Sequence, residues 1–145
     1  PQCFFMAKEE LFKMPFLSAI FRKLGAFPVA RGKGDTAAID RAVQIVKDGH
    51  IVAIFPEGTR STDGKLLRLK SGAILIAAQT GGDLLPCVVK KERGRFLRKR
   101  VIIRYGKIIE NTALGITGTI PSEIKKANKL LTDTLTHMLE EPSSN

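Results

Sequence analysis

The amino-acid sequence predicts an α/β fold, with a mixed and largely parallel central sheet that carries helices on both faces. Apolar runs with strand character alternate with stretches of helical periodicity along the chain, which is typical of sheets covered by helices. One run, 51–55, is rich in β-branched residues, as are strands that a parallel sheet buries on both faces. No internal repeat or linker is visible in the 145 residues, so we expect one domain over 1–145.

Four further segments complete the expected set of strands. Residues 3–7 form an apolar, partly aromatic run near the start of the chain. Residues 26–30 contain Pro28, which confines a strand to a sheet edge or to irregular pairing. The apolar runs 84–89 and 101–105 follow in the second half, on either side of a basic segment.

The first two expected helices lie between these strands. One follows Pro15 and ends at Gly25, and the other covers 36–47 with Asp35 as its N-cap. The first helix has apolar residues at helical spacing, which predicts a buried amphipathic helix; a surface for an acyl chain or a membrane is the alternative. These residues are Phe16, Leu17, Ile20, Phe21 and Leu24.

Two more helices are expected in the second half of the chain. Residues 71–80 are apolar on most sides, which predicts a buried helix, and Gly81 and Gly82 end it. A loop-like segment over 106–119 leads to Pro121, which begins the last helix. Its expected inner face consists of Ile124, Ala127, Leu131, Leu135 and Met138.

The chain is strongly basic, with 24 Lys and Arg against 14 Asp and Glu, a formal net charge of +10. This charge favours polyanionic partners: nucleic acid, anionic lipid headgroups, phosphorylated substrates or acidic carrier proteins. More than half of the excess lies in the basic segment 90–100, whose cations are Lys90, Lys91, Arg93, Arg95, Arg98, Lys99 and Arg100, against the single acid Glu92.

Hydropathy and the two cysteines bear on membrane spans, metal sites and redox environment. The sequence has no run of eighteen or more apolar residues, so no membrane-spanning helix is expected in it. Its two cysteines, Cys3 and Cys87, lack the spacing of metal ligands, so we expect no metal site, reduced thiols and an intracellular setting.

The segment Phe55-Pro56-Glu57-Gly58-Thr59-Arg60-Ser61 places polar groups where an α/β sheet binds ligands, at the carboxyl end of a strand. Pro56 ends the strand because it donates no ladder hydrogen bond. Gly58 allows positive φ or a close approach of the backbone to a ligand. Arg60 offers a planar set of donors suited to phosphate or carboxylate. The alternative is a tight turn with a surface ion pair between Glu57 and Arg60.

Two other cations also stand at strand or helix ends. Arg31 follows the strand 26–30, and Lys70 precedes the helix 71–80, whose first N–H groups attract anions. If the strands 26–30 and 51–55 run parallel as neighbours, Arg31 and Arg60 emerge at the same sheet edge. We therefore predict a phosphate clamp of Arg31, Arg60 and Lys70 beside Glu57. The alternative is that these cations are solvated surface residues.

The segment 55–61 resembles the signature block F-P-E-G-T-R-S of the glycerolipid acyltransferases, the 1-acyl-glycerol-3-phosphate (lysophosphatidic acid) acyltransferase family. Residues 25–31, Gly-Ala-Phe-Pro-Val-Ala-Arg, are similar to a second block that ends in an arginine for the acceptor phosphate. Leu85-Pro86-Cys87-Val88 is similar to the V-P-V block linked to the acyl donor or acyl chain. The resemblance implies that Pro86 lies on the acyl-donor side and that the acceptor phosphate is bound around Arg31, Glu57, Gly58, Thr59, Arg60 and Lys70.

The family's catalytic block, N-H-x-x-x-x-D, supplies a histidine general base and an aspartate that orients it. In this chain His50 is followed five residues later by Phe55, and His137 by Pro142, so neither fits. We expect no catalytic residue within the chain, and we expect the acyltransferase domain to be truncated at its N-terminus, after that block.

The resemblance implies transfer of a fatty acyl group to the free hydroxyl of 1-acyl-glycerol-3-phosphate, which gives phosphatidic acid. The expected co-substrate is an acyl-CoA or acyl-carrier-protein thioester, with direct attack and neither a metal nor another cofactor. An anionic membrane surface is a further expected partner, contacted through 90–100. The expected location is the cytoplasmic face of a membrane, peripheral or anchored through the missing N-terminal part.

Two other classes of function remain open from the residues. Gly32-Lys33-Gly34 begins a G-x-G-x-x-A pattern between a strand and a helix, as in dinucleotide-binding domains, although Pro28 weakens the strand. The segment 90–100 is basic enough for a nucleic-acid-binding module, but only Phe96 and Tyr105 are near it as stacking aromatics. We therefore expect no nucleic-acid partner.

Overall fold

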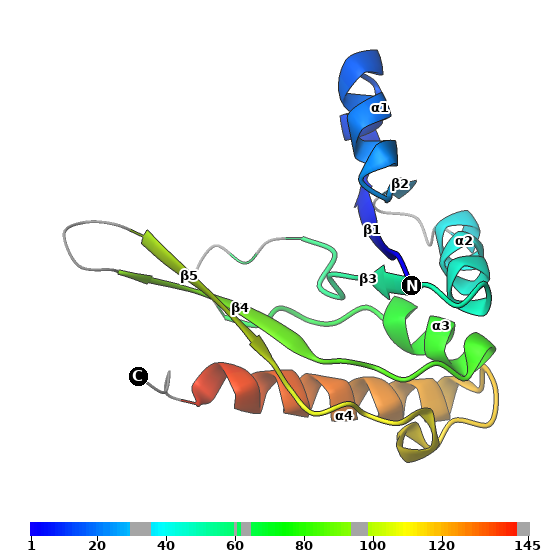
Figure 1. Cartoon of the computed structure of the whole chain (residues 1–145). Helices are drawn as coiled ribbons and strands as arrows, with labels where there is room; N and C mark the ends of the chain where they lie inside the picture. The colour runs from blue at the N-terminus through cyan, green and yellow to red at the C-terminus, as the bar shows by residue number, and fades with distance from the viewer. Residues whose placement is uncertain (30–35, 60, 62–64, 94–98, 142–145) are drawn as a thin grey trace. The chain divides into compact units, whose positions relative to one another are not determined.

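The computed structural model describes residues 1–29, 36–59, 61, 65–93 and 99–141 (Figure 1). The chain divides into two compact units, Pro1–Gly58 and Thr59–Asn145. Each unit contains strands and helices of its own. The mixed α/β class is therefore confirmed, although the described strands form two sheets, one parallel and one antiparallel.

The first unit contains a parallel sheet with the strand order β2-β1-β3, made of β1 (Cys3–Lys8), β2 (Ala26–Val29) and β3 (Ile51–Ala53). Both pairings are parallel, so the carboxyl ends of all three strands lie at one edge of the sheet. The assumption that 26–30 and 51–55 are neighbours is wrong, because β1 lies between them. About two strand spacings, roughly 10 Å, therefore separate β2 from β3.

Strand β3 is shorter and less buried than the run 51–55 suggests. It has three residues, and it forms an edge of the sheet in the described part of the chain. Ile51 is 52% exposed and Phe55 71% exposed, so the expectation of a fully buried strand is wrong at both ends. The reason is that β3 pairs only with Cys3–Phe5 of β1, and Ile54 and Phe55 continue past the ladder towards Pro56. Among the described strands β2 also lies at an edge of the sheet, as Pro28 predicts.

Helix α1 (Pro15–Lys23) follows a short 3₁₀ helix, η1 (Glu9–Phe12), and begins with Pro15 in its first turn as predicted. The structure describes every residue of α1, and none of them is buried, so the expectation of a buried helix is wrong. The helix packs against η1 and β2 with only part of its apolar surface. Phe21 lies against Phe12, with ring centroids 6.1 Å apart, and the Arg22 guanidinium lies 5.6 Å from the Phe12 centroid.

Helix α2 (Thr36–Lys47) packs against β3 and carries buried side chains at helical spacing. Ala42 and Val43 are buried as expected, and Ile39 and Val46 are half-buried. The remaining buried positions are Ala38 and Ile45, so the inner face is rotated slightly from the expected one. Asp35, the expected N-cap, lies outside the described residues.

The second unit contains an antiparallel pair, β4 (Cys87–Arg93) and β5 (Lys99–Tyr105). Both strands extend into the basic segment, where the sequence predicted none, because cross-strand pairing satisfies the backbone whatever the side chains are. Leu84, expected within the first of these strands, makes only an isolated bridge to Ile109.

Helix α4 (Pro121–Glu140) packs against β4 and against α3 (Gly72–Thr80). Its buried residues are the five that the sequence pattern predicted: Ile124, Ala127, Leu131, Leu135 and Met138. The prediction that α3 is buried is also confirmed, with Ile74 fully inaccessible. Gly81 ends α3 with φ 70°, as the Gly-Gly pair indicates. Among the described residues, no helix combines the length and the apolar character needed to cross a membrane.

Side chains of β4 and β5 also cap the C-terminal end of α4. The Lys90 ammonium donates a hydrogen bond to the Glu141 carbonyl oxygen at 2.9 Å. The Arg104 guanidinium donates to the carbonyl oxygens of Met138 at 3.0 Å and Glu141 at 3.2 Å. Cations at this end of a helix satisfy its last carbonyl groups and complement its dipole.

Candidate functional site

The signature segment forms a tight turn directly after β3. The Gly58 amide donates to the Phe55 carbonyl oxygen at 3.0 Å, which closes a four-residue turn with Pro56 and Glu57 at its centre. Gly58 has φ 69°, so of its two expected roles, positive φ or a close approach to a ligand, the structure shows the positive φ. Glu57 is half-buried within this turn, and Thr59, which follows it, is exposed.

The carboxyl edge of the parallel sheet presents one cation that the sequence reasoning missed. Lys8 is the last residue of the central strand β1, is exposed, and pairs in register with Val29, the last residue of β2. It therefore lies between the strand that leads to Arg31 and the strand that leads to Glu57. The expected strand ended at residue 7, and only the strand order of the structure shows that β1 is central.

Several predicted site residues lie outside the described residues. They include Arg31 and Arg60, so the phosphate clamp and the alternative Glu57–Arg60 ion pair both stay predictions. The Gly32-Lys33-Gly34 segment, on which a dinucleotide site would depend, lies outside them too. Of the other clamp residues, Glu57 and Gly58 belong to the first unit, and Thr59 and Lys70 belong to the second.

Lys70 is exposed and stands two residues before α3, as predicted. Ser71 is the N-cap residue with φ −75° and ψ −1°, and its side chain makes no capping hydrogen bond. Among the described residues, the first N–H groups of α3 therefore lack the acceptor that an N-cap side chain usually supplies to one of them. Behind Lys70, Leu69 is buried, and its carbonyl oxygen accepts a hydrogen bond from the Asn128 side-chain amide at 3.2 Å.

Pro86 is buried, and its carbonyl oxygen accepts a hydrogen bond from the Gly106 amide at 2.8 Å. Its neighbours Leu85 and Cys87 are exposed. A molecule that binds at this segment would therefore contact Leu85 and Cys87 rather than the proline ring. Although Cys87 is exposed as a residue, partial burial raises the pKa of its thiol above the ordinary value and so disfavours the thiolate.

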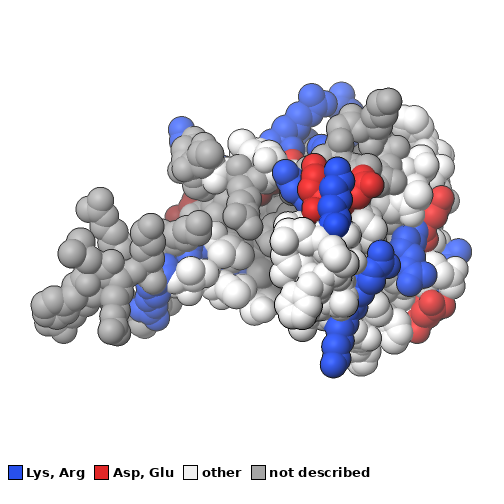
Figure 2. Space-filling model, turned by 90° about the horizontal axis from the view of Figure 1, so that it is seen from above, with Lys and Arg blue, Asp and Glu red and all other residues white. Residues whose placement is uncertain are grey.

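The basic segment does not present a block of equivalent cations. Lys90 is half-buried and bonded to the end of α4, whereas Arg100 is exposed. Residues 94–98, including Arg95 and Arg98, lie outside the described residues. On the face shown in Figure 2, the described Lys and Arg side chains form several separate groups, with Asp and Glu beside some of them. The expected role of 90–100 against a membrane stays a prediction.

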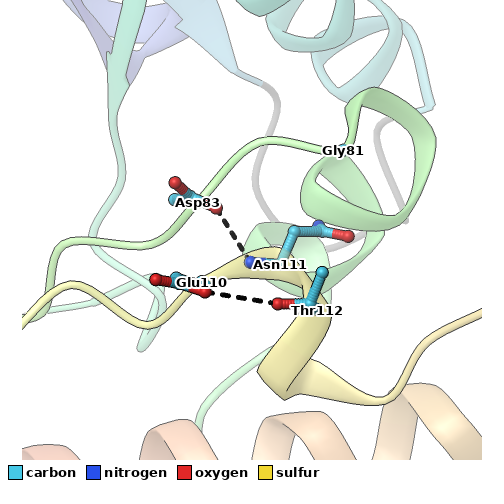
Figure 3. Close-up of a pocket in the computed structure, with 5 residues that line it drawn as sticks. All are labelled: Gly81, Asp83, Glu110, Asn111 and Thr112. Atoms are coloured by element: carbon cyan, nitrogen blue, oxygen red, sulfur yellow. Dashed lines mark hydrogen bonds between the residues drawn. The ribbon is translucent and has the colours of Figure 1, made fainter.

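A polar pocket lies between the end of α3 and η3 (Asn111–Leu114), lined by Gly81, Asp83, Glu110, Asn111 and Thr112 (Figure 3). The Asp83 carboxylate accepts a hydrogen bond from the Asn111 amide at 2.8 Å. The Asn111 side chain donates to the carbonyl oxygens of Ala77 at 2.9 Å and Gly82 at 3.1 Å. These bonds hold the end of α3 against η3, which gives the cluster a structural role.

The structure contains no candidate metal centre in the residues it describes, since no three His, Cys, Asp or Glu side chains are grouped there as ligands. Two groups of described site residues are left. The first is the turn over 55–58 together with Lys8, at the carboxyl edge of the parallel sheet. The second is Lys70, which precedes α3. Both are suited to binding an anion.

Comparison with known proteins assigns the chain to a family. Residues 1–90 match the family model described as Acyltransferase, which covers more than half of the chain. The chain therefore belongs to the acyltransferase family.

Individual relatives make the resemblance more specific. The chain is 38% identical over 85 residues to the 1-acyl-sn-glycerol-3-phosphate acyltransferase of Bacillus subtilis, covering 59% of this chain and 42% of the relative. It is 31% identical over 103 residues to the protein of the same name from Borreliella burgdorferi, covering 70% of this chain and 41% of the relative. The chain thus spans about two fifths of the length of these relatives.

A solved structure supports the fold assignment. The chain matches the crystal structure of the 1-acyl-sn-glycerophosphate (LPA) acyltransferase PlsC from Thermotoga maritima with a TM-score of 0.71 and 25% sequence identity. The match covers 99% of this chain and 58% of the PlsC chain. The resemblance of residues 25–31, 55–61 and 85–88 to the glycerolipid acyltransferases is confirmed, and so is the α/β fold that it implies.

Proposed function

We propose that a protein containing this chain transfers a fatty acyl group to the free hydroxyl of 1-acyl-glycerol-3-phosphate and so forms phosphatidic acid. The donor is the thioester of an acyl-CoA or an acyl carrier protein. Membership of the acyltransferase family and the names of the relatives support this proposal. No observation favours dinucleotide or nucleic-acid binding over it.

One observation carries the proposal: the signature turn follows a parallel strand directly, at the edge of the sheet where ligands bind in α/β proteins. Gly58 removes the Cβ from the turn and takes positive φ, which turns the chain sharply after Glu57. Arg60 follows two residues later. The segment is thereby suited to presenting a guanidinium at the end of β3.

In this proposal the chain's residues bind and orient the acceptor. Arg31, Arg60 and Lys70 hold the phosphate, and Lys8 adds a fourth cation at the carboxyl end of β1. Glu57 carries a negative charge, so it cannot bind the phosphate; it orients an arginine or accepts a hydrogen bond from an acceptor hydroxyl. Uncapped N–H groups at the start of α3 contribute further anion donors beside Lys70.

The chemistry is a direct acyl transfer. The acceptor hydroxyl oxygen attacks the thioester carbonyl carbon, the new C–O bond forms, and the C–S bond breaks. The departing sulfur takes up the proton that the hydroxyl loses, so a free thiol is released. The proposal includes no acyl-enzyme, metal or cofactor other than the thioester co-substrate. The general base is the histidine of the His-x-x-x-x-Asp block, which the 145 residues do not contain.

The acyl-donor side lies at Leu85 and Cys87 in this proposal. Both are exposed on either side of the buried Pro86, so they provide the apolar contact that the V-P-V block provides in the family. We further propose that the protein acts at the cytoplasmic face of a membrane, because the lipid acceptor is held there and thioester donors are dissolved in the cytoplasm.

The decisive experiment replaces Arg60 by Lys in an active full-length protein that contains this chain. Lysine keeps the charge but loses the paired donors that bind a phosphate, and each charge-assisted hydrogen bond contributes about 1.5–3 kcal/mol. We expect kcat/KM for the phosphorylated acceptor to fall on the order of tenfold or more. The loss should be much smaller for a matched acceptor without phosphate.

The control is Lys126→Ala, which removes an exposed cation from the outer side of α4. It should leave both rates unchanged, whereas Arg31→Ala and Lys8→Ala should resemble Arg60→Lys. Equal losses on the two acceptors would show that Arg60 does not bind the phosphate, and a surface ion pair with Glu57 would then be the better account.

A further inference from the structure

Helix α1 presents an apolar stripe that the described residues of its own unit leave exposed. We define this stripe as Phe16, Ile20 and Leu24. Phe16 is 77% exposed, Leu24 64% and Ile20 40%. Because Phe16, Ile20 and Leu24 are spaced four residues apart, they follow one another along a single side of the helix.

The apolar surface of α1 is wider than its packing requires. Leu17 and Phe21 are half-buried, and Phe21 packs against Phe12 of η1. Helix α1 contacts η1 and β2, and no residue of the helix is buried by these contacts. A helix in a water-soluble domain usually turns its apolar side to the core, so several large exposed apolar residues on one side indicate contact with another apolar phase.

The charges around the stripe indicate what that phase is. Lys13 precedes the helix, and Arg22 and Lys23 lie in its last turn; all three are exposed. Helix α1 itself contains no acidic residue. The two nearest acids in sequence, Glu9 and Glu10, lie in η1 and are offset by Lys8 and by these cations. An apolar side with cations at both ends is typical of helices that lie in the interface of an anionic bilayer.

We infer that α1 binds the surface of an anionic lipid bilayer, parallel to the membrane plane, with the stripe among the acyl chains and Lys13 and Lys23 at the headgroups. The helix has nine residues and is roughly 14 Å long, far too short to cross a bilayer. This inference deepens the proposed function, since an acylated acceptor is held in a membrane and the protein must meet it there. It places the membrane contact on α1 rather than on the basic segment 90–100.

The chain contains no tryptophan, which allows a direct test. In the variant Phe16→Trp the new indole is the single tryptophan of the chain. We expect its fluorescence to shift to shorter wavelength when vesicles of equal parts phosphatidylglycerol and phosphatidylcholine are added, and brominated acyl chains should quench it. The matched control is Gln44→Trp, at an exposed position of α2 in the same unit, which should show neither effect.

Binding strength gives a second measurement that does not involve tryptophan. Phe16→Gln combined with Ile20→Gln should lower co-sedimentation with the same vesicles by at least about tenfold, because two large apolar side chains no longer enter the bilayer. Lys13→Gln and Lys23→Gln should each lower it about fivefold and weaken its dependence on salt. All of these positions are exposed, and circular dichroism checks that the variants fold.

Two results would overturn the inference. Unchanged vesicle binding by the variant that combines Phe16→Gln and Ile20→Gln would place the contact elsewhere. The second result combines two measurements. Sedimentation would show a concentration-dependent dimer that this double variant no longer forms, and the fluorescence of the Phe16→Trp variant would shift to shorter wavelength without vesicles. This result would show that a second copy of the chain covers the stripe. Vesicle binding is measured without acyl transfer. The two measurements therefore distinguish a protein that is active but does not bind through α1 from one that binds through α1 but is inactive.

Discussion

Asn128 is a polar side chain on the inner side of α4, and it connects this helix to the segment that carries Lys70. Its Nδ2 group donates to the Leu69 carbonyl oxygen at 3.2 Å. Its Oδ1 atom is buried and has no hydrogen-bond partner among the described residues. The residue thus contributes one good bond and one unsatisfied acceptor, and these two have opposite effects on stability.

We predict that Asn128→Ala lowers the free energy of unfolding by about 1 kcal/mol, because a typical buried hydrogen bond contributes that much. Urea denaturation of the chain and the variant measures the difference. Asn128→Asp should cost more, since a carboxylate cannot donate to the Leu69 carbonyl. A gain in stability on Asn128→Ala would mean that the unsatisfied Oδ1 atom outweighs the bond.

Cys87 allows a prediction on pH. Burial raises the pKa of its thiol in the folded chain, so less thiolate is present at a given pH than in the unfolded chain. In the Cys3→Ser variant, which leaves one thiol, alkylation by iodoacetamide should be slower in the folded chain than in denaturant at the same pH. The neutral thiol favours the fold, so this contribution is full below the ordinary thiol pKa and is lost as the pH rises through the raised value. Equal alkylation rates would contradict it.

At the scale of single residues, the sequence predicts conformation better than partners. Gly58 has the positive φ that a glycine in a tight turn suggests, and Lys70 stands before α3 as the helix pattern requires. Lys8 and Asn128 were missed because their importance depends on contacts between segments distant in the chain. The strand order places Lys8 in the middle of the sheet, and the packing of α4 brings Asn128 to Leu69. Neither contact produces a pattern in the neighbouring sequence.

Gly25 shows how one element constrains the next. It has φ 83° at the end of α1, and a Cβ added there would lie 2.9 Å from the Cys3 carbonyl oxygen of β1. Its own carbonyl oxygen accepts a hydrogen bond from the Phe5 amide at 3.0 Å. The connection from α1 to β2 therefore requires both the left-handed conformation and the absence of a side chain.

We predict that Gly25→Ala lowers the free energy of unfolding by about 1–3 kcal/mol, through backbone strain and the contact with Cys3. The matched control is Gly49→Ala in the same unit. Gly49 has φ 80°, but nothing lies within 4 Å of its would-be Cβ, so only the strain remains. Thermal or urea denaturation should show the larger loss at Gly25. Equal losses at both sites would mean that β1 shifts to accommodate the methyl group.

The buried residues of a helix were predicted well where the helix packs against other elements of the same unit. The five residues of the inner face of α4 recur at helical spacing, and all five are buried. The burial of α1 was predicted wrongly because an apolar pattern does not say what covers it. The lengths of β4 and β5 were underestimated because backbone pairing continues through charged residues, which periodicity and hydropathy do not detect.

At the scale of the molecule, the prediction concerns activity. We expect the 145-residue chain by itself to be inactive, because it contains no His-x-x-x-x-Asp and therefore no pair that would deprotonate the acceptor. Thiol release from an acyl thioester, followed with and without lysophosphatidic acid, is the measurement, and heat-denatured chain provides the blank. Consumption of the thioester that depends on lysophosphatidic acid would contradict the prediction.

The α/β class could be read from the alternation of strands and helices, but the arrangement of the strands could not. The sequence does not show that β1 becomes the central strand, because parallel pairing joins segments with no local signal between them. Nor does it show that the described strands form two sheets in two units. The roles of Arg31 and Arg60 in phosphate binding stay predictions, and the kinetics with acceptors that have or lack a phosphate test them.

The central place of β1 has a consequence for how the protein is made. Cys3 pairs with Ile51, and Phe5 with Ala26 and Ala53, so β1 leaves the ribosome before either of these partners. At about 5–20 residues per second, the interval between synthesis of β1 and of β3 is roughly 2–10 seconds. During that interval Phe4 and Phe5 are open to non-native association. Early chaperone contact, or slow passage of the ribosome through the codons for 26–53, would therefore affect the yield of folded protein.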